Sequence, residues 1–406
     1  MKYDSYTLPN GIRLIHKFVP SLVSHCGLLI NTGSRDENDQ EHGMAHFIEH
    51  VFFKGTKKRK TFHILSRLED VGGQINAYTT KEETCIYAAF LSDYYNRSVE
   101  LISDIIFNST FPAKEINKEK EVIIDEINSY KDIPGEMIFD DFEEMVFKNN
   151  PLGRNILGTS EKLKSFTKQN IENFIQNNYH TDEMVICSVG NIIFPKLLKL
   201  VQKYFEKIPA SYRVSQRKKI SNYSPNQKTI KKNAHQAHCI IGNIAYDHKD
   251  DRRIGLALLN NLMGGPGLNS RLNLSLREKN GFAYNIESNY SPYSDTGLFN
   301  IYFSTDKNNL NRSLNIIQKE LKLIKSKKLG KLQLQKAKRQ ITGQLAISSE
   351  NNENMMLAMA KSHLIYNKFD SIEKISKKIE KITSEQILEI ANDILVTDKL
   401  SSLIFE

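Results

Sequence analysis

The stretch His46-Phe47-Ile48-Glu49-His50 brings two histidines and a glutamate together within one predicted helix, which starts near Gly43. Residues four positions apart in a helix lie one turn apart on the same face. His46 and His50 can therefore offer two imidazole nitrogens to one metal ion. Neutral imidazole suits Zn²⁺, and a hydrolytic zinc site uses three protein ligands and keeps one position for water. Glu49 lies close enough to take a proton from that water without being a ligand.

A third ligand has to come from elsewhere in the chain. The predicted helix at 113–130 carries four acidic candidates, namely Glu119, Glu121, Asp125 and Glu126. Glu119 and Glu126 are seven positions apart, so two turns of helix place them on one face. One of the two could then bind the metal while the other orients a ligand or assists the water. Spacing alone does not choose between them, and a solvated, charged helix face is the alternative interpretation.

Three other histidines have positions that could mimic metal ligands. His42 lies one turn before His46, but it precedes Gly43 near the predicted start of the helix, which favours a surface position. His235 and His238 have no carboxylate motif near them, so packing within a strand is expected instead. None of the three is therefore included in the predicted site.

Length and element order favour an α+β fold with two similar domains. The 406 residues exceed one ordinary domain, and the hydrophobic fraction of 40% fits a globular protein. Strand and helix patterns recur in the same order on either side of a polar stretch at 209–228. We predict an internal duplication in which each domain is a mixed or antiparallel sheet backed by helices. The predicted boundaries are 1–210, a linker at 211–229, and 230–406.

Charge and hydropathy argue against nucleic-acid and membrane functions. The net charge is +9, but the lysines are spread out, and the densest basic cluster, Arg217-Lys218-Lys219, lies in a polar stretch where solvated side chains are expected. The chain has no tryptophan and no basic-aromatic nucleic-acid motif. No apolar run reaches the length of a membrane span, and residues 1–4 do not begin a signal peptide. A cytoplasmic location is expected.

A set of short stretches spread over nearly the whole chain carries a family resemblance. In the first half they are Gly33-Ser34-Arg35-Asp36-Glu37, Phe53-Lys54-Gly55-Thr56, Asn76-Ala77-Tyr78-Thr79, Glu121-Val122-Ile123-Ile124-Asp125-Glu126, Pro151-Leu152-Gly153-Arg154 and Gly158-Thr159. In the second half they are Ser270-Arg271-Leu272, Leu276-Arg277-Glu278-Lys279 and Gly281-Phe282-Ala283-Tyr284. Together with the histidine motif, whose inverted spacing is a zinc-peptidase signature, they resemble the pitrilysin, insulinase and mitochondrial processing peptidase family. The chain looks like a short, two-domain bacterial-type member.

The resemblance implies a zinc-dependent endopeptidase that holds one Zn²⁺ per chain and hydrolyses unstructured peptides or processes leader sequences. In the family pattern Glu126 matches the third zinc ligand, beside His46 and His50. Glu119 matches the acid that assists from behind the ligands, and Glu49 matches the base that activates a zinc-bound water.

The resemblance also implies four substrate contacts. Asn76 and Ala77 look like the edge strand that pairs with a peptide backbone, although an ordinary sheet edge would have the same pattern. Arg277 and Tyr284 resemble the pair that contacts the substrate and the developing oxyanion, where a cation and a phenol can stabilise negative charge. Without the resemblance they would be read as a helix-surface charge and a strand aromatic.

A two-domain chain of this family is expected to pair with another chain, because four such domains close around the substrate chamber in longer members. The partner would be a second copy or a related subunit, and Arg277 and Tyr284 would then reach the zinc site of the partner chain. The alternative function is that of a noncatalytic structural or partner subunit. Such subunits usually lose motif residues, whereas this chain keeps the acids and histidines of the motif.

Overall fold

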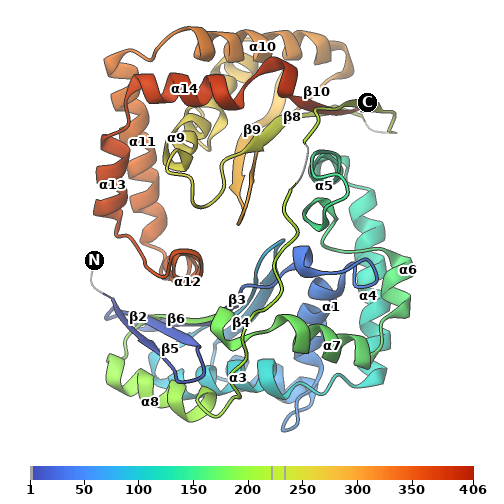
Figure 1. Cartoon of the computed structure of the whole chain (residues 1–406), viewed down its shortest axis with the longest axis vertical. Helices are drawn as coiled ribbons and strands as arrows, with labels where there is room; N and C mark the ends of the chain where they lie inside the picture. The colour runs from blue at the N-terminus through green and yellow to red at the C-terminus, as the bar shows by residue number, and fades with distance from the viewer. Residues whose placement is uncertain (1–2, 221–222, 233–234) are drawn as a thin grey trace. The chain divides into compact units, whose positions relative to one another are not determined.

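The computed structural model describes residues 3–220, 223–232 and 235–406 (Figure 1). The chain forms two compact units. The first consists of Met1–Asn128, Arg154–Lys218 and Ile347–Asp370, and the second of Ser129–Gly153, Lys219–Ala346 and Ser371–Glu406. Within the described ranges, no helix is both long enough and apolar enough to cross a membrane.

The first unit is built on a mixed sheet of six strands. The strands are β1 (Asp4–Thr7), β2 (Arg13–Phe18), β3 (Val23–Ile30), β4 (Gln74–Thr79), β5 (Thr84–Leu91) and β6 (Met184–Gly190). Their order is β1-β2-β6-β3-β5-β4; β2 and β6 are parallel, and all other neighbours are antiparallel. Every residue of β6 is buried, as expected for a central strand with helices on both faces.

Most helices of the first unit pack on one face of this sheet around its main apolar core. They are α1 (Met44–Val51), α2 (Thr61–Glu69), α3 (Tyr95–Asn108), α4 (Ala113–Lys131), α6 (Ser160–Ser165), α7 (Lys168–Asn178) and α8 (Phe194–Phe205). The buried face of α4 is formed by Ile116, Ile123 and Ile127, which follow helical spacing, and Glu119 lies on the same face. Burial of this isoleucine row therefore turns an acidic side chain inward.

The opposite face of the first sheet is covered by a helix from near the C-terminus, α12 (Asn352–Tyr366) (Figure 1). Met355, Met356 and Met359 of this helix pack against the apolar side chains of the central strands. At the edge of the contact, Lys361 Nζ lies 3.2 Å from a carboxylate oxygen of Glu83. The first sheet is therefore completed by a segment distant from it in sequence.

The second unit repeats this plan with a mixed sheet of five strands in the order β7-β11-β8-β10-β9. The strands are β7 (Gln227–Ile230), β8 (Ala237–Ala245), β9 (Ala283–Pro292), β10 (Gly297–Thr305) and β11 (Ser401–Phe405), of which β7 and β11 are parallel. Four helices enclose the apolar core on one face: α9 (Arg253–Gly264), α10 (Leu310–Ser326), α11 (Lys331–Ser349) and α14 (Ser384–Ile394). α13 (Ile372–Glu380) contacts α9, and α5 (Pro134–Val146) covers the opposite face of the sheet.

The predicted α+β class is confirmed, with two helix-backed mixed sheets. The compact units differ from the predicted sequence-continuous domains, because α5 packs with the second sheet and α12 packs with the first. The division after Lys218 falls inside the predicted linker at 211–229. The apolar pattern of a helix is the same whether it packs on the sheet of its own half of the sequence or on the sheet of the other half. The placement of α5 and α12 could therefore not be predicted from their sequences.

The segment just before this division is anchored to the first unit by a buried ion-pair cluster. The Arg217 guanidinium donates to both Asp36 carboxylate oxygens at 2.9 Å, and Arg213 also donates to Asp36. Burial would raise the pKa of Asp36, but the two guanidinium groups outweigh it and lower that pKa below its ordinary value. The solvated position predicted for the basic cluster is therefore wrong for Arg217, whose side chain is 10% exposed, although Lys218 and Lys219 are exposed.

The contact between α12 and the first sheet is expected to be a major source of stability. Replacing the fully buried Met356 by Ala should lower the free energy of unfolding by about 2–5 kcal/mol, because the lost packing leaves a cavity. Urea unfolding monitored by circular dichroism measures the change. The exposed Asn354 on the same helix provides the control, since Asn354→Ala removes no buried contact. Equal stability of the Met356→Ala protein and the wild type would contradict the assigned role of α12.

Candidate metal centre

Helix α1 carries the histidine motif, and its start is defined by a close backbone contact. Gly43 precedes the helix with a φ of +96°, a conformation that favours glycine. A Cβ atom at Gly43 would lie 2.9 Å from Gly158 Cα and from the carbonyl oxygen of Leu157. The chain therefore needs glycine where α1 begins, and His46 and His50 lie one turn apart on the helix that starts there.

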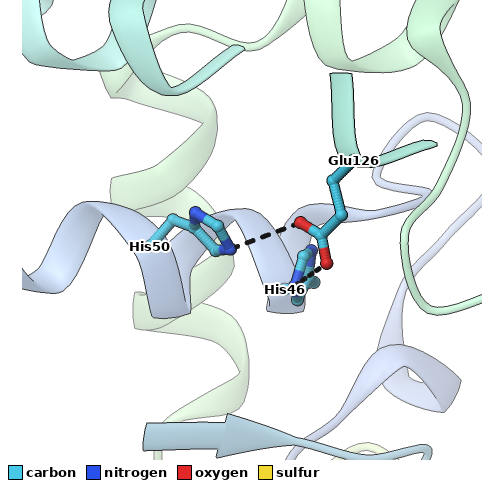
Figure 2. Close-up of side chains that lie close together, drawn as sticks. All are labelled: His46, His50 and Glu126. Carbon is cyan, nitrogen blue, oxygen red and sulfur yellow. Dashed lines mark ion pairs between the residues drawn. The ribbon is translucent and has the colours of Figure 1, made fainter. Parts of the chain in front are cut away.

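Helix α4 brings Glu126 to the two histidines (Figure 2). One carboxylate oxygen of Glu126 lies 3.9 Å from His46 Nε2, and the other lies 3.7 Å from His50 Nε2. One donor atom from each residue lies within 4.8 Å of the other two. Over residues 3–220, 223–232 and 235–406, this is the one group of three or more histidine, cysteine, aspartate or glutamate side chains that could hold a metal ion. Two helices distant in sequence thus form a single candidate metal centre.

The environment of His46 favours its neutral form. Burial, followed by the charge of His50, lowers the pKa of His46 to about 4. A neutral imidazole keeps the lone pair that a metal ligand needs. His46 is therefore ready to coordinate a metal ion at neutral pH without first losing a proton.

Glu119 lies behind His50 and is held from two sides. One of its carboxylate oxygens lies 3.3 Å from His50 Nδ1, and the other lies 2.8 Å from Lys54 Nζ. Burial raises the pKa of Glu119, but the hydrogen bonds from His50 and Lys54 outweigh this effect and lower it overall. A carboxylate at Nδ1 leaves His50 Nε2 free to face Glu126. Lys54 belongs to the family-like stretch Phe53-Lys54-Gly55-Thr56, and its role could not be predicted from the sequence.

Glu49 lies beside the histidines without belonging to the three-residue group. Burial raises the pKa of Glu49, and the charge of Glu126 raises it further, while Thr79 and His50 oppose the shift. A partly desolvated carboxylate is a stronger base than one in water. The geometry and the electrostatics both suit a group that accepts a proton near the candidate metal centre.

The structure also separates the residues that sequence spacing left undecided. Glu119 and Glu126 lie against the histidines of α1, although Glu126 is itself partly exposed to solvent. Glu121 and Asp125 are exposed and do not belong to the metal-capable group. His42 lies outside the metal-capable group and contacts the carbonyl oxygen of Asn155 through Nε2 at 2.9 Å. Packing of α4 on α1 therefore selects two of the four acids.

A cavity of about 320 Å³ adjoins this centre within the first unit. Its walls combine apolar side chains with the polar groups already described; they are Glu49, His50, Phe53, Lys54, Leu65, Ile75, Asn76, Ala77 and Glu119. Asn76 and Ala77 lie on β4, which is at the end of the strand order and pairs with β5. The predicted edge strand is thus an edge of the sheet, and it lines the cavity next to the metal centre.

The remaining predicted residues belong to the second unit. Arg277 lies in a π-helical turn (Asn273–Glu278) with its side chain half exposed, and Tyr284 is 62% exposed near the start of β9. Their predicted substrate contacts stay a prediction. His238 packs within β8 and contacts Tyr302 Oη through Nδ1 at 2.9 Å, as expected for strand packing. The same expectation is wrong for His235, which is exposed in a bend before β8.

Two known protein families match the chain in succession. Residues 15–160 match the family described as Insulinase (Peptidase family M16), and residues 165–341 match the Peptidase M16 inactive domain. The first match contains the histidine motif and Glu126, and the second contains Arg277 and Tyr284. The half that carries the candidate metal centre is thus the half that matches the insulinase description.

Known relatives resemble the chain over almost its full length. It is 33% identical to an uncharacterized zinc protease of Bacillus subtilis, with 98% of this chain and 97% of the relative covered. An uncharacterized zinc protease of Rickettsia bellii is 32% identical over 98% of this chain and 96% of its own length. Among solved structures, a protease from Helicobacter pylori has a TM-score of 0.91 at 20% identity, covering 100% of this chain and 99% of that one. This last likeness is one of fold.

Proposed function

The chain belongs to the insulinase family of peptidases, peptidase family M16, and we propose that it is a zinc-dependent endopeptidase that hydrolyses unstructured peptides or processes leader sequences. The observation that carries the proposal is the convergence of His46, His50 and Glu126, with Glu49 beside them. Two imidazole nitrogens and one carboxylate oxygen are a donor set used by zinc hydrolases, which fits one zinc ion per chain. His46, His50 and Glu126 would hold that ion.

Glu49 acts as the general base in this proposal. A bound zinc ion would act as a Lewis acid, which lowers the pKa of a water molecule toward neutrality and polarises a carbonyl group. Glu49 accepts the proton of the attacking water and later returns it to the leaving amine. Its pKa is raised by burial and by Glu126, which strengthens it as a base.

Glu119 serves as a positioning residue for His50. Its contact with Nδ1 at 3.3 Å places the ring proton on that nitrogen and leaves Nε2 unprotonated. Lys54 occupies the other carboxylate oxygen at 2.8 Å. Glu119 therefore assists from behind the ligand, as the family resemblance implies.

The edge strand β4 favours a peptide in an extended conformation as the substrate. Backbone groups along the outer edge of Asn76 and Ala77 can pair with an added strand, and such pairing requires a substrate whose own backbone is free. The adjoining cavity of about 320 Å³ can take one side chain of that peptide. Unstructured peptides and leader segments meet both conditions, whereas a folded protein does not.

Arg277 and Tyr284 supply further contacts in the proposal. They bind the substrate and stabilise the oxyanion that forms during hydrolysis. We expect the chain to pair with a second copy or a related subunit, in which case these residues act at the zinc site of the partner chain. Their exposed side chains in the second unit support this role, because neither is buried in its own core.

The proposed activity is tested with a quenched fluorescent peptide library and the purified protein, with zinc content determined on the same sample. We expect one zinc per chain and cleavage that a chelator abolishes and added zinc restores. Chelation removes the Lewis acid but leaves Glu49 in place, so recovery on adding zinc separates metal loss from unfolding. Cleavage that survives complete zinc removal would contradict the proposal.

Two further outcomes of that experiment have distinct meanings. A protein that holds zinc but cleaves no peptide, alone or with a related subunit, would favour the alternative of a noncatalytic partner subunit. A protein that does not bind zinc would overturn the metal centre and the function built on it. Size-exclusion chromatography with light scattering on the same sample determines whether the chain pairs with itself.

A further inference from the structure

Three stretches that resemble the family's signatures, at 33–37, 151–154 and 158–159, contain none of the proposed metal ligands or the proposed base. They lie apart in sequence, yet they meet at the start of α1. Glu37 ends the motif at 33–37, and its carboxylate accepts hydrogen bonds from the backbone N–H groups of Gly43 and Ala45, each at 2.9 Å. Gly43 itself provides no side-chain cap for the helix. The carboxylate therefore takes the place of the missing cap and satisfies backbone donors in the first turn.

Glu37 is itself held by its surroundings. It is 2% exposed, and its backbone carbonyl and that of Asn38 accept hydrogen bonds from the Arg154 guanidinium. The backbone carbonyl of Arg154 accepts a hydrogen bond from Lys81 Nζ at 2.5 Å. Two segments distant in sequence thus brace the residue that caps α1.

The glycine contacts at the same place leave little room for α1 to shift. A Cβ atom at Gly158 would lie 2.5 Å from the carbonyl oxygen of His42, and His42 Nε2 contacts the Asn155 carbonyl oxygen at 2.9 Å. His46 follows Ala45 directly, so any rotation of the first turn moves His46 with it. The N-terminus of α1 is therefore fixed by contacts on its backbone, from the cap and from the loop at 155–158.

We propose that Glu37 is a positioning residue of the metal centre, which holds the first turn of α1 so that His46 keeps its place opposite Glu126. The inference rests on the proposed zinc site, but Glu37 contacts neither metal ligands nor substrate. It acts through the backbone of Gly43 and Ala45. The motif at 33–37 thereby acquires a function that its sequence alone did not reveal.

The test compares zinc affinity in three proteins, measured by competition with a chromophoric chelator. Glu37→Gln replaces one acceptor oxygen by an NH₂ group that faces a backbone N–H. We expect it to weaken zinc binding by about 10-fold, the lower end of the effect of outer partners on metal affinity. The matched control is Asp104→Asn, because Asp104 is equally buried but accepts its hydrogen bonds from the side chains of Thr56 and Arg59, whereas Glu37 accepts from the backbone of α1. Both variants should lose thermal stability, and only the first should lose zinc affinity.

The possible results separate the inference from the proposed function. Unchanged zinc affinity in Glu37→Gln, with a loss of stability like that of Asp104→Asn, would overturn the positioning role and leave the metal centre intact. Absence of zinc binding in the wild type would instead overturn the proposed function. If Glu37→Gln does not fold, Glu37→Asp keeps the carboxyl group and shortens its reach, and it should also bind zinc more weakly. Wild-type affinity in Glu37→Asp would then overturn the inference.

Discussion

The Glu49→Gln protein is expected to bind zinc as the wild type does and to have almost no peptidase activity. Glutamine has nearly the same shape as glutamate but cannot accept the proton of the attacking water. Loss of a general base lowers kcat by about 10²–10⁴-fold. Because Glu49 lies outside the three-residue group, the metal-binding donors remain in place.

The measurement combines kcat and KM on a peptide that the wild type cleaves with the zinc content of both proteins. The exposed Glu69 at the C-terminal end of α2 offers the matched control, since Glu69→Gln makes the same chemical change outside the site. We expect KM to change little, because glutamine keeps the size and shape of the glutamate in the cavity wall. Substantial activity in zinc-loaded Glu49→Gln would show that another group is the base.

The second large effect is expected at Glu126. Replacing it by Gln removes the negative charge of the carboxylate, one oxygen of which lies 3.9 Å from His46 Nε2 and the other 3.7 Å from His50 Nε2. Zinc affinity should fall by more than about 100-fold, because even an outer partner of a ligand is worth about 10–100-fold. Peptidase activity should be lost in parallel and return in part only at high zinc concentration.

The neighbouring Asp125 provides a close control for this change. It is exposed on the same turn of α4, and Asp125→Asn makes the same loss of charge one residue away. Chelator competition on the two variants should therefore give very different dissociation constants. Equal weakening in both would mean that the general negative charge of α4 attracts zinc, and Glu126 would not be a ligand.

Several features of the fold could be predicted from the sequence because their causes are local. Apolar spacing located α4 to within one residue, since a helix that buries one face repeats apolar residues at intervals of three or four. The apolar run of β6 is likewise a local pattern, typical of a buried strand. The exchange of α5 and α12 was not predicted, because which sheet a helix covers depends on the path of the whole chain.

For the metal centre, the sequence by itself determined that His46 and His50 share one face of a helix with Glu49 beside them, because helical periodicity acts within five residues. Spacing favoured Glu119 and Glu126 among the four acids of α4, because these two share a face, and only the family resemblance assigned Glu126 as the ligand and Glu119 as the assisting acid. The tertiary structure decided which acids face the histidines, since the packing of α4 on α1 sets its rotation. It also brought Lys54 to the Glu119 carboxylate and Glu37 to the backbone of α1. Their contacts depend on tertiary packing, because they join segments that come together only in the folded protein. A local sequence pattern does not predict such contacts.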